Sequence, residues 1–181
     1  MNTYKIKFTQ LQQEIFRFLC IHAGESFNQR TIARRLDMSP PAVANVLPAL
    51  EKEGLVQIDK SKTMNLVMLR FNRDSQKAVD RKRTENLSVI FESGLADFLE
   101  EHFAGCAIVL FGSYALGEDT VRSDVDIAII GAREKQTDMS HFEKFLERPI
   151  NLQFFESISK IGKNLRTNVL RGITLRGIVE I

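Results

Sequence analysis

The sequence predicts an α/β protein of two domains, and three observations lead to this prediction. Its 181 residues are 44% hydrophobic and 27% charged, a composition typical of folded chains, and they suffice for two small domains. The charge changes sign near the middle: residues 1–90 carry 15 Lys and Arg against 9 Asp and Glu, whereas residues 91–181 carry 10 against 14. The pattern changes too, from amphipathic helices to short apolar runs typical of buried strands. We therefore expect domains at residues 1–72 and 87–181, joined by a charged segment with a helix start at residues 73–86.

The first domain is predicted to contain three helices and a hairpin. Thr9 is a suitable cap for the first helix, whose apolar residues recur at helical spacing. A second helix is expected at about residues 28–36, and Ser39 followed by Pro40 marks the start of a third. Pro48 lies inside this third helix, where it should remove one backbone hydrogen bond and kink the chain. The remaining elements are two short strands, at residues 55–58 and 65–69.

This order of elements, with the segment RTIARRLDMSPPAVANVLPALEKEGLVQID, resembles the winged helix-turn-helix of prokaryotic transcription regulators. The resemblance covers roughly residues 8–71. It implies that the third helix enters the major groove of DNA and that the hairpin, the wing, contacts backbone phosphates. The positive charge of this half fits a polyanionic partner. A winged helix used for protein contact or for forming a homodimer is the alternative.

The side chains around the third helix decide which DNA contacts to expect. Its outward positions are mostly proline and alanine, and among them only Asn45 can make a two-point contact to a base edge. Basic side chains nearby can still bind phosphates without reading a base sequence. The alternative is that these charges form only a solvated surface. The predicted DNA-binding residues are Arg30, Arg34, Arg35, Asn45, Lys60 and Lys62.

The second domain should begin with helical residues and continue with strands. The basic triplet at residues 81–83 is interpreted as a solvated helix start or as an extension of the nucleic-acid surface. A helical apolar stripe starts at Leu87, and Gly94 is expected to interrupt it. The apolar run at residues 106–111 suits a buried strand and ends at Gly112-Ser113, where a turn into a helix must follow. Free amides at a helix start and a serine hydroxyl are suitable donors to phosphate oxygens.

Two carboxylates follow this turn after ten intervening residues. Asp124 and Asp126 precede or open a second apolar strand that includes residues 127–130, and alternation places both on one face of that strand. Two acidic groups so close together repel each other and cannot be buried cheaply. A divalent cation is the natural compensation.

The combined motif FGSYALGEDTVRSDVDIAII resembles the nucleotidyltransferase superfamily typified by DNA polymerase beta, and specifically its minimal members with a Gly-Ser, ten residues, Asp-x-Asp signature. The resemblance covers about residues 86–179 and implies a mixed sheet with flanking helices. It implies that Gly112 and Ser113 bind nucleotide phosphates and that the catalytic pair Asp124 and Asp126 binds two Mg²⁺ ions. The resemblance implies that the donor is a nucleoside triphosphate, with ATP as the expected one. Its nucleoside monophosphate group would be transferred to a hydroxyl.

The sequence departs from that family at its third carboxylate. The strand expected near residues 150–155 has Asn151 where the family usually carries an acid, Gln153 is neutral, and Glu156 lies at the strand's end. An amide oxygen can ligate a cation but cannot accept a proton near neutral pH. Leu116 also stands where related transferases usually have an arginine. Two functions stay open: a working transferase, and a transcription regulator whose weakened transferase domain senses a nucleotide.

Further expectations concern partners and location. No apolar run approaches the roughly 20 residues that span a bilayer and no secretory signal is expected, so we predict a cytoplasmic protein without membrane contact. Cys20 and Cys106 belong to no zinc or disulfide motif. The acceptor hydroxyl stays open, with a protein such as a HEPN-family toxin and a small molecule such as an aminoglycoside as candidates. A scaffold that binds no nucleotide is a third interpretation.

Overall fold

The chain divides into two compact units, Met1–Val79 and Asp80–Ile181, in a computed structural model that describes residues 8–60 and 67–180. Each unit has its own hydrophobic core. Helix α4 (Gln76–Glu92) begins in the first unit and continues into the second, so most of the charged segment expected at residues 73–86 is helical. None of the helices in the described part of the chain is long and apolar enough to cross a membrane.

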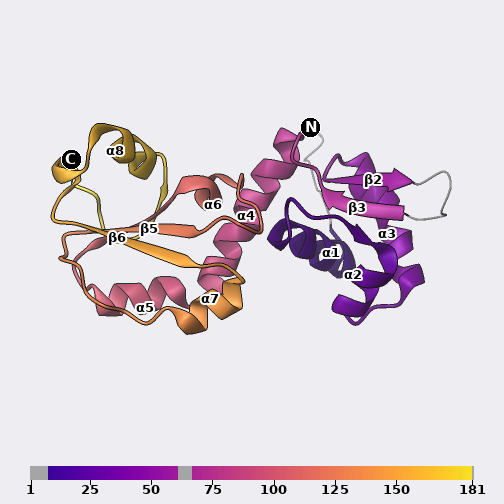
Figure 1. Cartoon of the computed structure of the whole chain (residues 1–181), viewed down its shortest axis with the longest axis horizontal. Helices are drawn as coiled ribbons and strands as arrows, with labels where there is room; N and C mark the ends of the chain where they lie inside the picture. Colours follow the sequence, from indigo (N-terminus) through magenta and orange to yellow (C-terminus); the bar gives the residue numbers. More distant parts are fainter. Residues whose placement is uncertain (1–7, 61–66, 181) are drawn as a thin grey trace, which may run out of the picture. The chain divides into compact units, whose positions relative to one another are not determined.

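The first unit contains three helices and a three-stranded antiparallel sheet of order β1-β3-β2 (Figure 1). Both strands of the predicted hairpin are present: β2 starts one residue later than expected, and residues 65–66 of the second predicted strand lie outside the described residues. The short β1 was not predicted. Its hydrogen-bond partner is β3, which only the folded chain brings near. The elements are α1 (Gln10–Ile21), β1 (Phe27–Asn28), α2 (Gln29–Arg35), α3 (Pro40–Lys52), β2 (Val56–Lys60) and β3 (Val67–Phe71).

The helices of the first unit begin at polar caps, as the sequence predicts. Thr9 forms a capping box with Gln12 at the start of α1, and the Ser39 hydroxyl accepts a hydrogen bond from the Ala42 amide at the start of α3. Pro48 lies within α3 with its ring exposed, and the helix continues beyond it to Lys52. The missing amide is therefore accommodated without ending the helix.

The second unit is built on a four-stranded mixed sheet of order β6-β5-β4-β7, in which only β5 and β6 are parallel. Gly94, with φ +74°, separates α4 from α5 at the predicted interruption. The elements are α5 (Leu95–His102), β4 (Ala107–Phe111), α6 (Gly112–Leu116), β5 (Val125–Ile130), α7 (Ser140–Leu146), β6 (Ile150–Phe155), the 3₁₀ helix η1 (Ile158–Lys160), α8 (Lys163–Leu170) and β7 (Ile173–Arg176).

Helices cover both faces of this sheet, with α5 and α7 on one side and α8 on the other (Figure 1). Alternation along the strands sorts the side chains between the two faces. Ile127 and Ile129 pack in the core that includes residues of α5 and α7, whereas Ala128 packs with Ile158 and Val169 beneath η1 and α8. Asp126 lies two residues before Ala128, so it belongs to the α8 face.

Candidate nucleotide and metal site

Four chain segments meet at one end of the sheet. Phe111, the last residue of β4, pairs with Asp126 near the start of β5, and Asp126 pairs with Asn151 near the start of β6. Leu110 pairs with Ile173, the first residue of β7. The turn after β4, the beginnings of β5 and β6, and the turn between α8 and β7 therefore lie at the same sheet end.

Gly112 adjoins the carboxylate of Asp126. Its φ is +74°, a conformation that side chains rarely adopt, and a Cβ built on it would lie 2.6 Å from Asp126 Oδ2. A residue larger than glycine would therefore displace the carboxylate. The fold thus brings one predicted phosphate-binding residue against one predicted metal ligand.

The two other predicted residues flank this contact. Asp124 is exposed immediately before β5, and its spacing of two residues from the half-buried Asp126 puts both on one strand face. Ser113 is half-buried as the second residue of α6, and its carbonyl accepts a hydrogen bond from the Glu118 amide at 3.0 Å. The Gly112-Ser113 turn is therefore fixed to the loop that leads toward Asp124.

Asn151 lies beside Asp126, one of the two predicted metal ligands. Its Nδ2 donates a hydrogen bond to Asp126 Oδ1 at 2.9 Å. An amide therefore contacts this carboxylate at the position where the resemblance implies a third acid. Glu156 follows the other end of β6, about 16 Å along the strand from Asn151, and its carboxylate lies 3.9 Å from Arg133. Glu156 therefore does not replace the third carboxylate.

The donor set fits one divalent cation with oxygen ligands. Among the residues that the structure describes, no group of three His, Cys, Asp or Glu side chains could hold a metal. Two carboxylates are nevertheless the usual protein contribution to a magnesium site that is completed by substrate phosphates and water. Asn151 can add its amide oxygen if the amide turns over. Asp124 and Asp126 are thus the residues that would hold the ion.

A pocket of about 190 Å³ opens on the Gly112-Ser113 turn. Leu116 lines it from α6, while Asn168 and Arg171 line it from the C-terminal end of α8. Sequence reasoning did not find these two residues, because more than fifty residues separate them from the Gly112-Ser113 turn and no spacing rule connects them. The pairing of β7 with β4 and the packing of α8 on the sheet bring them to the turn.

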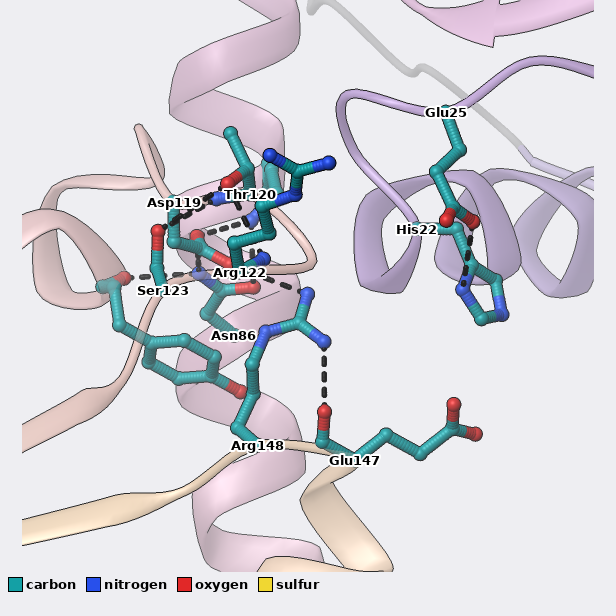
Figure 2. A network of polar contacts seen from close by, with 11 residues as sticks. His22, Glu25, Asn86, Asp119, Thr120, Arg122, Ser123, Glu147 and Arg148 are labelled. Carbon is teal, nitrogen blue, oxygen red and sulfur yellow. Dashed lines mark hydrogen bonds and ion pairs between the residues drawn. The ribbon is translucent and has the colours of Figure 1, made fainter.

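A buried polar network supports the loop between α6 and β5 (Figure 2). Lys82 of α4 is completely buried and forms an ion pair with the buried Asp119. Asn86 Nδ2 donates to Asp119 Oδ1 at 2.7 Å and to the Tyr114 carbonyl at 2.9 Å. A guanidinium nitrogen of Arg148 lies 3.7 Å from Asp119 Oδ2. The interpretation of residues 81–83 as a solvated surface is therefore wrong for Lys82.

The same loop is closed by short-range hydrogen bonds just before Asp124. The Thr120 amide donates to Ser123 Oγ at 3.0 Å, and the Ser123 amide donates to the Thr120 carbonyl at 2.9 Å (Figure 2). With Asp119 held by Lys82, the loop is fixed at both its middle and its end. The sequence offered no signal for this, since Asp119 belongs to no recognised motif position.

The predicted DNA-binding residues differ in their surroundings. Arg30 and Arg34 of α2 and Asn45 of α3 are exposed. Arg35 is exposed too, but its guanidinium lies over the Phe18 and Phe27 rings, 5.7 and 5.3 Å from their centroids, and 3.3 Å from His22 Nε2. Arg35 is thus engaged with the first core. Lys62 and the side chain of Lys60 lie outside the described residues.

Comparison with known proteins gives separate matches for the two parts. Residues 12–63 match the MarR family, and residues 92–174 match the nucleotidyltransferase domain family. A solved structure of the zinc-responsive MarR family member ZitR of Lactococcus lactis is 22% identical, with a TM-score of 0.39, over 56% of this chain. A second ZitR structure, in complex with DNA, is also 22% identical with a TM-score of 0.39 and the same coverage. The match spans 65% and 64% of the two ZitR chains, under two thirds of their length.

No match to a curated protein was found. The two family matches fall on the two halves that charge and patterning separate, and they agree with the helical, hairpin-bearing first unit and the mixed sheet of the second. The chain therefore combines a MarR-type winged helix-turn-helix with a nucleotidyltransferase domain.

Proposed function

We propose that the C-terminal unit binds a nucleoside triphosphate with Mg²⁺ and transfers its nucleoside monophosphate to a hydroxyl. The contact between Gly112 and Asp126 supports this proposal most directly, because the turn proposed to bind phosphates lies against the carboxylate proposed to bind the metal. Ser113 and the free amides of the turn would hold the phosphates, and Asp124 and Asp126 would hold the ion. ATP is the first nucleotide to test.

In the proposed reaction, the acceptor oxygen forms a bond to the α-phosphorus as the bond to the bridging oxygen breaks, and pyrophosphate leaves. When bound, Mg²⁺ would supply positive charge at the phosphate oxygens. The chain's own residues orient the triphosphate through the turn after β4. The hydroxyl proton must pass to a base, and the amide of Asn151 cannot accept it near neutral pH.

Calorimetric titration of the full chain with ATP and Mg²⁺, followed by an assay for released pyrophosphate, tests the proposal. We expect binding by the wild type and loss of Mg²⁺-dependent binding in Asp126→Asn. Glu134→Gln is the matched control, because it removes one carboxylate charge from an exposed loop of the same unit. A wild type that binds none of the common nucleoside triphosphates would refute the proposed function.

A second candidate function is a regulator that senses the nucleotide without turning it over. The hydrogen bond from Asn151 to Asp126 favours it, since an amide stands where a proton acceptor would be needed. Binding requires only phosphate donors and metal ligands, so it can persist without that acid. ATP binding without pyrophosphate release in the wild type, with release appearing in Asn151→Asp, would support this function. Equal release by both proteins would indicate that water suffices as the base.

We further propose that the N-terminal unit binds DNA and that the protein acts in transcription regulation. DNA binding is supported by three observations: Arg30 and Arg34 are exposed, this half of the chain is positively charged, and residues 12–63 match the MarR family. A cytoplasmic location, a homodimer and a protein acceptor such as a HEPN-family toxin belong to the same proposal.

A further inference from the structure

We infer that Arg171 and Asn168, at the C-terminal end of α8, bind the polyphosphate end of the nucleotide. The inference rests on the proposed function and assigns it two residues that the sequence motif does not contain. It starts from the pocket on the Gly112-Ser113 turn, which both residues line together with Leu116 and Glu118.

The packing of α8 explains why its end reaches this pocket. Val169 is buried in the same core as Phe111 and Ala128, which places α8 on the sheet face that carries Asp126. The following turn lies directly against β4, because a Cβ built on Gly172 would be only 2.4 Å from the Leu110 carbonyl oxygen. Asn168 and Arg171 are therefore held next to the phosphate-binding turn by the core and by the β4–β7 pairing.

Arg171 and Asn168 give one side of the pocket the donors that an anionic ligand needs, while the lining also includes Glu118. Arg171 is exposed, and in the described part of the chain its side chain has no ion pair or hydrogen bond, whereas Arg176 is bound by Asp97 and Glu100. A guanidinium offers five donors in a planar fork that matches phosphate oxygens. The Asn168 amide adds a neutral donor one turn earlier on α8, and Leu116 contributes only apolar surface.

Glu118 allows the direction of an affinity change to be predicted. Glu118 lines the same pocket as Arg171. Among the described residues, no ion pair joins the two side chains. A negative charge near a bound polyphosphate weakens binding, while it would strengthen the binding of a cation. Glu118→Gln should therefore raise the affinity for ATP, and a lowered affinity would contradict a phosphate site here.

The main test compares Arg171→Gln with wild type in titrations with ATP, AMP and inorganic tripolyphosphate, each with Mg²⁺. Loss of a charge-assisted hydrogen bond should weaken ATP and tripolyphosphate binding about ten- to a hundredfold and leave AMP binding unchanged. Arg171→Lys, which keeps the charge, should retain more affinity than Arg171→Gln. Arg166→Gln is the matched control, because Arg166 lies on the same helix but does not line the pocket.

The outcomes separate this inference from the proposed function. Unchanged ATP affinity in Arg171→Gln, or equal losses for ATP and AMP, overturns the inference alone. A wild type that binds tripolyphosphate but no nucleotide supports the phosphate site and overturns the proposed function. A wild type that binds neither ligand overturns both. Thermal melting of each variant shows whether a loss of affinity reflects unfolding instead. If Arg171→Gln is unfolded, the inference is tested by whether Arg171→Lys retains tripolyphosphate binding.

Discussion

Gly112 is the residue on which the proposed site depends most directly. Its positive φ and its contact with Asp126 impose two separate costs on any side chain there. We expect Gly112→Ala to lose about 1 kcal/mol of stability from the backbone conformation and, in addition, to lose ATP binding because the new methyl group displaces the carboxylate. Thermal unfolding and calorimetric titration measure the two effects.

Gly105→Ala is the control that separates them. Gly105 also has a positive φ, of +82°, but a Cβ there would meet nothing within 4 Å. It should therefore show the backbone cost and keep normal ATP affinity. If both variants bound ATP like the wild type, the contact between Gly112 and Asp126 would have no bearing on the nucleotide.

Arg34 and Arg35 are neighbours with different expected roles. Both are exposed, but only Arg35 lies over two phenylalanine rings and contacts His22 among the described residues. Arg34→Gln should lower the slope of log affinity for duplex DNA against log salt concentration by about 1, since each phosphate contact contributes roughly that amount. Arg35→Gln should instead lower stability by about 1 kcal/mol through the lost cation–π contacts. Anisotropy titrations at several salt concentrations, with melting curves, check both.

At the scale of elements, α4 is attached to the loop between α6 and β5 through buried charges. Asp119 faces both Lys82 and Arg148, and Asn86 donates a hydrogen bond to it. Asp119→Asn would leave two buried cations without their carboxylate, so we expect a loss of about 3–5 kcal/mol in the free energy of unfolding. Lys82→Met should cost less, because Asp119 would keep Arg148 and Asn86. Urea unfolding of the full chain measures both losses.

Two comparisons test the expectation that Asp119→Asn is more destabilising than Lys82→Met. Asp124→Asn changes the same chemical group at an exposed position and should leave stability nearly unchanged. The double variant Lys82→Met with Asp119→Asn should be less destabilised than the sum of the single variants, since the two residues contact each other. Additive losses, or a larger loss from Lys82→Met than from Asp119→Asn, would show that the ion pair does not support this loop.

The elements that the sequence predicts well are those with local signals. Thr9 and Ser39 cap helices where expected, and Gly94 separates two helices. The helix start predicted within residues 73–86 is present, at Gln76, but the apolar stripe began only at Leu87 because the buried positions before it are polar: Lys82 and Asn86 occupy helical spacing that periodicity arguments reserve for apolar residues. Arg171 escaped because its place beside Ser113 arises from strand pairing between distant segments.

The two halves of the candidate site therefore differ in how far sequence could define them. The Gly112-Ser113 turn and the Asp124, Asp126 pair form a compact motif whose chemistry follows from residue type and spacing. The register of β5 with β6 was needed to establish that Asn151 contacts Asp126 and that Glu156 does not reach it. Tertiary pairing thus decides which residues complete the motif.

At the scale of the whole molecule, helix α4 has residues in both units. Its residues Gln76–Val79 lie in the first unit, where Ala78 joins the core, and Lys82, one turn further on, belongs to the network that holds the α6–β5 loop. A nucleotide that changes how this loop is held would act on a helix that continues into the first unit. The proposed nucleotide sensing and the proposed DNA binding would be linked through this helix.

The sensing function then makes a reciprocal prediction. If ATP with Mg²⁺ changes the affinity of the full chain for a DNA duplex by some factor, DNA must change the affinity for ATP by the same factor, because both describe one coupling free energy. We expect a factor of about 5 to 150, the usual range for coupled sites. Titrations of DNA with and without ATP, and of ATP with and without DNA, give two independent measurements of this factor.

Asp126→Asn should abolish both changes in affinity, whereas Glu134→Gln should keep them. Unchanged affinities in both directions would mean that the two units bind their ligands independently, and the nucleotide would then have to act through its transfer reaction.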